Sequence, residues 1–361
     1  MSALRHVCWA ASWLFAAGPV LAQQPDGALL ATPALLQDLM IQDVCLDAGG
    51  KVVIGVAPLP GEPRCASRRD LRPGEPLPYH KHDHSPPEDR DAPNGYQRHD
   101  SFPVETAALG VVVEHTFDFG VGGRRFGVFE VGAEGGDVAV LSPGIVSLGA
   151  TEDPGAGLQI WVGECQGRVT PDALRHAWLI ATYDPNRPAP LQGETVARLN
   201  RVRRGALETC PARFNGAYTQ WSLRPFAFRA GRGQGTPLAL ATLISDHYGK
   251  PGRADANHVE RFYFTRELGG TRWERWENRN GNADFSRERV AELAAQIAES
   301  GRCSPSEVPL GGAPLVLIDC REWTRIVPPS DPGGDPPGFF IESLRARGEA
   351  LDLFGKPAGG R

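Results

Sequence analysis

The residues His258–Glu277 (HVERFYFTRELGGTRWERWE) decide the fold class of this chain. Two runs rich in β-branched and aromatic residues, at 258–266 and 271–277, flank the segment ELGG at 267–270. β-Branched and aromatic side chains favour strands, and glycine adopts the positive φ that a tight turn between two strands needs. The stretch therefore predicts an antiparallel β-hairpin.

Similar runs bounded by glycine occur along most of the chain, at 52–56, 110–117, 126–131, 137–141, 145–148, 158–162, 178–183, 217–223 and 238–244. The chain also contains 43 glycines and 32 prolines, which suits many short strands with frequent turns. We therefore expect a mainly β protein, with two associated antiparallel β-sandwich (jelly-roll-like) halves and one flanking α-helix.

The strand series is interrupted by a proline-rich stretch, DPNRPAPLQG, which reads as a linker or crossing loop. The stretch from 328 is again rich in proline and glycine. The expected order is a signal peptide at 1–22, an N-terminal β domain at 23–183, the linker at 184–193, a C-terminal β domain at 194–327 and a Pro/Gly-rich segment at 328–361.

One helix is predicted at 286–299, inside the C-terminal half. Its apolar residues recur with helical spacing at Val290, Leu293, Ala294 and Ile297. Asp284 or Ser286 can cap its start, and Gly301 follows its end. We expect this helix to pack on the flank of a sheet, near Cys303.

The first residues resemble a secretory signal peptide. Arg5 precedes an apolar run at 7–17, and Val20-Leu21-Ala22 forms a small-residue cleavage site. We expect cleavage after Ala22 and a periplasmic or secreted protein. No later stretch has some 18 consecutive apolar residues, so no membrane span is expected. The formal net charge of −5, without a basic cluster of note, disfavours nucleic acid as a partner.

Six cysteines remain after removal of the signal, which is an even number in an oxidising compartment. They fall into three pairs that are local in sequence, so we predict the bridges Cys45–Cys65, Cys165–Cys210 and Cys303–Cys320. The second of these would join the two halves. A zinc–thiolate site is disfavoured because no C-x₂₋₄-C pair occurs.

The predicted hairpin carries acids beside aromatic rings, which is the composition of a carbohydrate site. Aromatic faces stack on sugar rings, while paired acids protonate the leaving oxygen and act as nucleophile or base. The candidate catalytic residues are Glu260, Glu274 and Glu277. The candidate ligand-binding residues are Tyr263, Trp273 and Trp276.

A structural interpretation of the same residues stays open. Glu274 and Glu277 are three residues apart, so they point to opposite faces of a regular strand unless a β-bulge intervenes. Arg272 and Arg275 are equally close in sequence. Cross-strand ion pairs with Glu260 or Glu267 would then explain the acids.

A second candidate site is the histidine-rich stretch YHKHDH at 79–84. In an extended chain His80, His82 and His84 project from one face, and His99 or Asp100 could complete a site for Zn²⁺ or Cu²⁺. The alternative is a solvated histidine-rich loop, because prolines surround the stretch.

No signature of a serine hydrolase or a nucleotide-binding enzyme is present, so the sequence leaves open whether the protein is an enzyme. We expect an exported protein that binds a cell-envelope or extracellular polysaccharide, with cleavage of that polysaccharide as an open question. The alternatives are a metal-binding export protein that uses the histidines and a non-enzymatic envelope interaction module.

Overall fold

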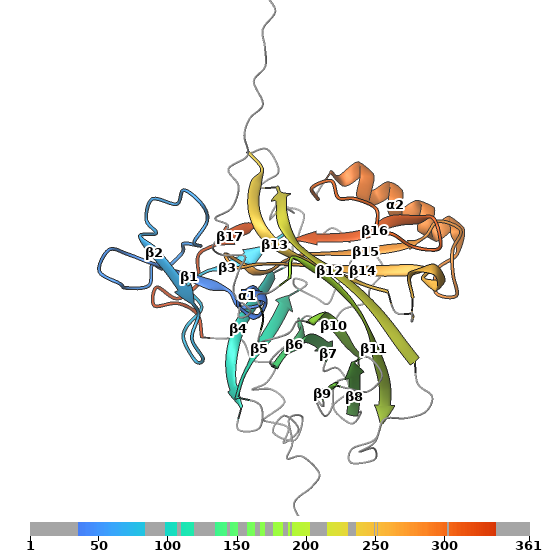
Figure 1. Ribbon diagram of the computed structural model, residues 1–361. Helices are drawn as coiled ribbons and strands as arrows, with labels where there is room; N and C mark the ends of the chain where they lie inside the picture. The colour runs from blue at the N-terminus through green and yellow to red at the C-terminus, as the bar shows by residue number, and fades with distance from the viewer. Residues whose placement is uncertain are drawn as a thin grey trace, which may run out of the picture.

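The computed structural model describes residues 35–83, 98–106, 110–118, 134–142, 145–150, 157–162, 167–169, 176–182, 187, 190–202, 215–229, 236–248, 250, 252–301 and 303–336 (Figure 1). The predicted signal peptide lies outside these residues, as does most of the predicted C-terminal segment.

Strands dominate the described chain. In chain order the elements are α1 (Leu35–Asp38), β1 (Asp43–Leu46), β2 (Ser67–Asp70), β3 (His80–His82), β4 (Arg98–Thr106), β5 (Gly110–Asp118), β6 (Glu134–Ser142), β7 (Ile145–Ala150), β8 (Gly157–Val162), β9 (Gly167–Val169), β10 (His176–Thr182), β11 (Gln192–Val202), β12 (Asn215–Phe228), β13 (Leu238–His247), a 3₁₀ turn (Arg253–Asp255), β14 (His258–Thr265), β15 (Gly269–Asn278), α2 (Arg287–Ser300), β16 (Leu315–Glu322) and β17 (Arg325–Val327).

Three antiparallel sheets form from these strands (Figure 1). The first large sheet has the order β10-β7-β6-β5-β4-β3-β17, and the second has the order β16-β15-β14-β13-β12-β11-β8-β9. β1 and β2 pair separately. The predicted fold class is confirmed: the protein is mainly β, with two groups of antiparallel strands and one long helix.

Strands from both sides of the predicted linker share the two large sheets. β8 and β9 precede the linker and extend the eight-stranded sheet next to β11, which begins at Gln192. β17 follows the linker by more than a hundred residues and pairs with β3 in the seven-stranded sheet. The division into an N-terminal β domain at 23–183 and a C-terminal β domain at 194–327 stays a prediction.

The main hydrophobic core joins the two large sheets. Its buried side chains come from α1 and the turn after it, from β5 and β10, and from β12, β13 and β14: Leu36, Leu39, Met40, Val113, Ile180, Ala181, Trp221, Leu223, Leu243, Phe262 and Phe264. Each Leu, Ile, Val, Phe or Met of this core contributes about 1.5–3 kcal/mol when it leaves water. We call the face of the eight-stranded sheet that carries Phe262 and Phe264 its core-side face.

The predicted helix is confirmed to within a residue as α2. The hydroxyl of Ser286 accepts a hydrogen bond from the backbone N–H of Arg289, and Gly301 ends the helix with φ +56°. Val290 and Leu293 are buried against Ile318 of β16. The helix therefore packs on the edge strand of the eight-stranded sheet, as Figure 1 shows.

Two of the three predicted disulfides are present. Cys45–Cys65 closes the loop between β1 and β2, and Cys303–Cys320 ties the segment after α2 to β16. Cys165 and Cys210 lie outside the described residues, so their pairing stays a prediction.

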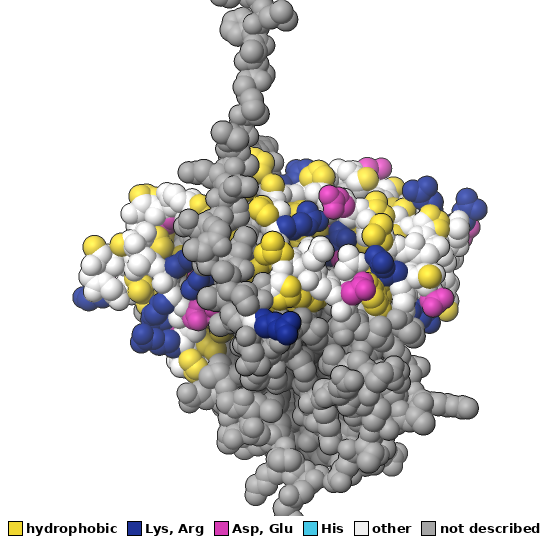
Figure 2. Space-filling model, in the orientation of Figure 1, with side chains coloured by type: hydrophobic (Ala, Val, Ile, Leu, Met, Phe, Trp, Pro, Cys, Tyr) yellow, Lys and Arg dark blue, Asp and Glu magenta, His cyan; other side chains and the backbone are white. Residues whose placement is uncertain are grey.

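The surface in Figure 2 shows one face of the molecule. Hydrophobic, basic and acidic side chains of the described residues are interspersed on it. Within the described ranges, no helix is both long enough and apolar enough to cross a membrane.

Candidate functional site

The pairing of β14 with β15 sorts the predicted hairpin residues onto two faces. Partners directly opposite each other in an antiparallel pair lie on the same face. His258 is paired with Glu277, Glu260 with Arg275, and Phe262 with Trp273. We call five residues of the core-side face the core-side group: His258, Glu260, Trp273, Arg275 and Glu277. Trp273, which is partly buried, packs against the main hydrophobic core. Tyr263, Glu274 and Trp276 lie on the opposite face.

Glu274 and Glu277 point to opposite faces, as their spacing predicts for a regular strand. A register shift does occur beside them, but it lies in the pairing with β16, where Arg275 faces Asp319 and Trp276 faces Leu317. The extra residue is therefore in β16 and leaves the alternation of β15 intact. The acids that share one face are Glu260 and Glu277.

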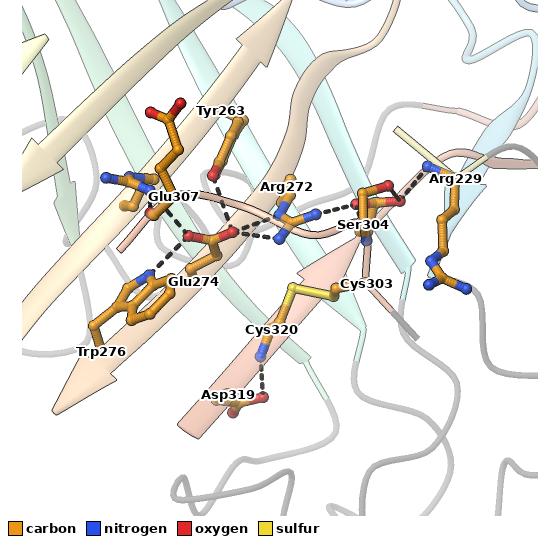
Figure 3. A network of polar contacts seen from close by, with 12 residues as sticks. Arg229, Tyr263, Arg272, Glu274, Trp276, Cys303, Ser304, Glu307, Asp319 and Cys320 are labelled. Carbon is orange, nitrogen blue, oxygen red and sulfur yellow. Dashed lines mark hydrogen bonds and ion pairs between the residues drawn. A yellow bond between two sulfur atoms is a disulfide. The ribbon is translucent and has the colours of Figure 1, made fainter. Parts of the chain in front are cut away.

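Glu274 is the centre of a buried polar network on the opposite face (Figure 3). Its carboxylate accepts hydrogen bonds from the Tyr263 hydroxyl at 2.9 Å, from Nε1 of Trp276 at 2.8 Å and from Nε of Arg272 at 2.8 Å. Burial alone would raise the pKa of Glu274, but Arg272 and Arg261 outweigh it and lower that pKa. Glu274 therefore stays ionised as a structural anion.

The network continues across neighbouring strands. Arg272 also forms an ion pair with Glu322 of β16, and both side chains are fully buried. Arg261 forms an ion pair with Asp246 of β13 and donates a hydrogen bond from Nη1 to the backbone oxygen of Glu307 at 2.6 Å. Charged groups on four adjacent strands therefore neutralise one another on this face.

A covering segment, residues 303–307, lies over this network. The backbone N–H of Ser304 donates to Glu322 at 3.2 Å, and Cys303 is bonded to Cys320 of β16 (Figure 3). On the same face the residues Tyr263 and Trp276 are only 1% and 4% exposed, and each packs in a hydrophobic cluster. The structure therefore gives these two predicted ligand-binding residues no exposed ring face on which a sugar could stack.

Arg275 organises the core-side group. Its Nε lies 2.7 Å from Oε1 of Glu277, and its Nη1 lies 3.6 Å from Oε1 of Glu260. Asn282 donates a hydrogen bond to the second oxygen of Glu277. The expected cross-strand ion pair between Arg275 and Glu260 is thus present. Glu267 pairs instead with Arg68.

Both acids of the core-side group hold protons more tightly than usual. Burial raises the pKa of Glu260 to about 7, with a further contribution from the negative charge of Glu277 and an opposing one from Arg275. Burial also raises the pKa of Glu277, although Arg275 opposes the shift. A carboxyl group that titrates near neutral pH beside a second carboxyl is a candidate for a functional site.

Part of the core-side group is accessible. His258, Trp273 and Arg275 are half-buried, whereas Glu260 and Glu277 are buried. Glu260 and Arg275 belong to a polar row that crosses four strands. In this row His247 lies opposite Glu260, and Asp319 lies opposite Arg275. An aromatic side chain and a row of hydrogen-bonding groups therefore meet on one face.

The described histidines of the predicted metal site lie on two faces of the β3–β4 pair. His82 is paired with Arg98 at the β3–β4 junction, so the alternation puts His80 with Asp100 on one face and His99 on the other. His84 lies outside the described residues. Within the described part of the chain, no group of three or more His, Cys, Asp or Glu side chains is arranged to hold a metal ion.

His80 is already held by two carboxylates. Its Nδ1 lies 2.9 Å from Asp100, and its Nε2 contacts Asp335. Burial opposes protonation of this ring, but the two carboxylates outweigh burial and raise the pKa of His80. Both ring nitrogens thus serve as donors in a buried ion-pair arrangement, and neither offers a lone pair to a metal. A zinc or copper site at the remaining histidines stays a prediction.

Sequence reasoning missed the contacts that hold the turn between β14 and β15. The ammonium group of Lys81 donates hydrogen bonds to the backbone oxygens of Leu268 and Gly270, and the Tyr79 hydroxyl donates to the backbone oxygen of Glu267. Burial lowers the pKa of Lys81 to about 7. The sequence contained one signal for this lysine. Side chains alternate along a strand, so Lys81 points to the face opposite His80 and His82.

Comparisons with protein-family models, with curated proteins and with solved structures found no match for this chain.

Proposed function

We propose that this protein is exported and binds a cell-envelope or extracellular polysaccharide at the core-side group. One observation carries the proposal. Trp273, half-buried, shares a face with the Glu260–Arg275–Glu277 cluster, so an aromatic surface lies beside carboxyl and guanidinium groups. Sugar recognition uses this combination: the ring stacks on the apolar face of a sugar, and the polar groups bind its hydroxyls.

The arrangement favours binding over hydrolysis. Glycoside hydrolysis needs one carboxylic acid to protonate the leaving oxygen and one carboxylate to act on the other side of the bond. Here Arg275 forms ion pairs with both Glu260 and Glu277, and Asn282 also donates a hydrogen bond to Glu277. Both carboxyl groups are therefore already engaged by side chains of the protein.

Two substitutions on the core-side face test the proposal. Wild-type protein, Trp273→Ala and Glu260→Gln are applied to a panel of immobilised envelope and extracellular polysaccharides. We expect wild-type binding to at least one polysaccharide. Loss of the Trp273 ring should weaken it about three- to tenfold, since an aromatic contact contributes about 0.5–1.5 kcal/mol beyond its buried area.

Trp276→Phe is the matched control, because it changes a tryptophan on the opposite face of the same strand. It should retain binding once circular dichroism shows that it is folded. Absence of binding to every polysaccharide by the wild type would contradict the proposal. Equal loss of polysaccharide binding in Trp273→Ala and Trp276→Phe would contradict the assignment of the binding site to the core-side face.

A further inference from the structure

The chain that follows β17 turns back and lies against the segment before β3. We call residues 328–336 the strap. Asp335 forms an antiparallel bridge with Leu77, through backbone hydrogen bonds of 2.7 and 3.1 Å. Gly334 has a φ of +95°, and a Cβ atom added to it would lie 3.0 Å from Cβ of Pro76. The end of the strap is therefore fitted closely against the chain next to β3.

The carboxylate of Asp335 both shapes the strap and fastens it. It accepts hydrogen bonds from the backbone N–H groups of Ser330 and Asp331 at 3.0 and 2.9 Å, which hold the turn together. It also contacts Nε2 of His80, while Nδ1 of the same ring lies 2.9 Å from Asp100 of β4. We call the side chains of His80, Asp100 and Asp335 the clasp. One imidazole ring thus joins the strap to two strands of the seven-stranded sheet.

The geometry of the clasp needs a proton on both ring nitrogens. Ionised carboxylates only accept hydrogen bonds, and a neutral imidazole has a single N–H. Burial alone would raise the pKa values of Asp100 and Asp335, but their contacts with His80 outweigh it and help to lower both, that of Asp335 to about 2. Both acids are therefore ionised. When His80 loses a proton, one carboxylate faces a lone pair instead of a donor.

The strap is the side of the clasp that gives way. The side chain of Asp100 is 1% exposed and lies 3.3 Å from Nε of Arg98. The side chain of Asp335 is 18% exposed, and most residues of the strap are exposed as well. A buried carboxylate that loses a donor is left unsatisfied, whereas one at the surface can turn to water. The remaining proton is therefore expected on Nδ1, with Nε2 facing Asp335.

The other charges near the clasp do not replace this proton. Arg98 of β4 opposes protonation of His80, and β17 places the uncharged Val327 opposite it. On β3, His82 is paired with Arg98 on one side and with Arg325 on the other. Burial, together with these guanidiniums, lowers the pKa of His82 to about 3, so this ring is neutral. The same positive charges disfavour a metal ion beside His80.

We propose that the clasp is a proton-controlled switch: the doubly protonated ring of His80 holds the strap against the sheet, and loss of one proton releases it. The direction of the pH effect follows from the clasp. Burial opposes protonation, but Asp100 and Asp335 outweigh it and raise the pKa of His80 above its ordinary value of 6.5. The strap is therefore fully held below pH 6.5 and is released as the pH rises through the raised pKa. The switch does not depend on the proposed function.

Hydrogen exchange of the Leu77 and Asp335 amides, corrected for the intrinsic effect of pH, measures release of the strap between pH 6 and pH 9. In the wild type we expect protection to fall by up to about tenfold per pH unit above pH 6.5. The amide of Asp335→Asn can donate to or accept from the ring, so this variant should lose most of the fall. Asp331→Asn is the matched control, because its side chain caps Gly333 in the same turn, and it should follow the wild type.

Two further comparisons keep the test specific. Lys81 also titrates in this range, but it holds the β14–β15 turn, so its effect is common to the wild type and both variants. NMR titration of the His80 ring in the wild type needs no variant, and we expect a midpoint above pH 6.5. A midpoint at or below 6.5 would overturn the proposal. So would wild-type protection that does not change with pH, or an equal fall in the wild type and a folded Asp335→Asn.

Discussion

Glu274 shows at the scale of a single residue why an acid in a strand can be structural. It accepts hydrogen bonds from Tyr263, Arg272 and Trp276 and is fully buried. Glu274→Gln would leave the guanidinium of Arg272 with only one buried carboxylate. We expect a loss of about 3 kcal/mol in the free energy of unfolding, measured by urea denaturation.

The control for that substitution is Glu292→Gln. Glu292 is exposed on α2 and pairs there with Arg289. Exposed pairs of this kind contribute little, so we expect a change below about 0.5 kcal/mol. Similar effects of the two substitutions would show that the buried network adds no stability.

Gly270 is a second residue whose identity the packing requires. A Cβ atom added there would lie 2.4 Å from Cε1 of His99, so the ring or the turn must move. We expect Gly270→Ala to reduce the free energy of unfolding by about 1–3 kcal/mol, as overpacked sites do. Gly252→Ala is the control in thermal denaturation, because nothing lies within 4 Å of that position. A neutral Gly270→Ala would contradict the packing described for the turn.

Local pattern was enough to predict some pairs of residues and not others. The Arg275–Glu260 ion pair follows from two strands joined by a short turn. The Arg272–Glu322 and Arg261–Asp246 pairs and the contacts of Lys81 join strands that no short turn connects. The sequence spacing could not predict them, because they depend on which strands become neighbours.

At the scale of elements, the covering segment depends on its disulfide. Cys303 and Cys320 are 17 residues apart, and a loop of that size constrains the unfolded chain by about 3 kcal/mol. We expect Cys303→Ser with Cys320→Ser to lose stability of that order in urea. Amide exchange should rise first at 303–307, whose contacts to Glu322 and Arg261 the bridge holds in place. Unchanged exchange in this segment would contradict its dependence on the bridge.

Elements with strong local signals were predictable, and short edge strands were not. The β14–β15 hairpin has its turn glycines and α2 has its cap and apolar spacing, so both were predicted from sequence. β3 and β17 have three residues each and pair with one another across more than two hundred residues. Their strand character comes from tertiary pairing, which overrides weak local preference.

The whole molecule is organised by long-range pairing that composition could not specify. The sequence predicted two sandwich-like groups of strands, and two large sheets are present. It could not predict that β8 and β9 extend the eight-stranded sheet or that β17 extends the seven-stranded one. The hairpin turn lies where elements of both sheets and of the β1–β2 pair contact one another.

Two acids far apart should each contribute to the pH dependence of the whole molecule in the same direction. The pKa values of Asp43 and Glu260 are raised to about 8 and about 7, so each stabilises the folded state at low pH and loses that effect as the pH rises. Between pH 5 and pH 7 each of these coupled protons lowers the free energy of unfolding by about 1.4 kcal/mol per pH unit. The buried histidines His82, His99 and His115, whose pKa values burial lowers, act in the opposite sense below about pH 6.5, so the contribution of each acid is read as the difference in slope between wild type and variant.

Asp43→Asn and Glu260→Gln should each remove one such contribution from the measured slope of unfolding free energy against pH. Asp43 lies beside Arg266, six residues along the hairpin from Glu260, which is about 20 Å in an extended strand. At that distance the effects should add, so the double variant should lose both contributions. A double variant with the slope of either single variant would show that the two acids belong to one coupled site.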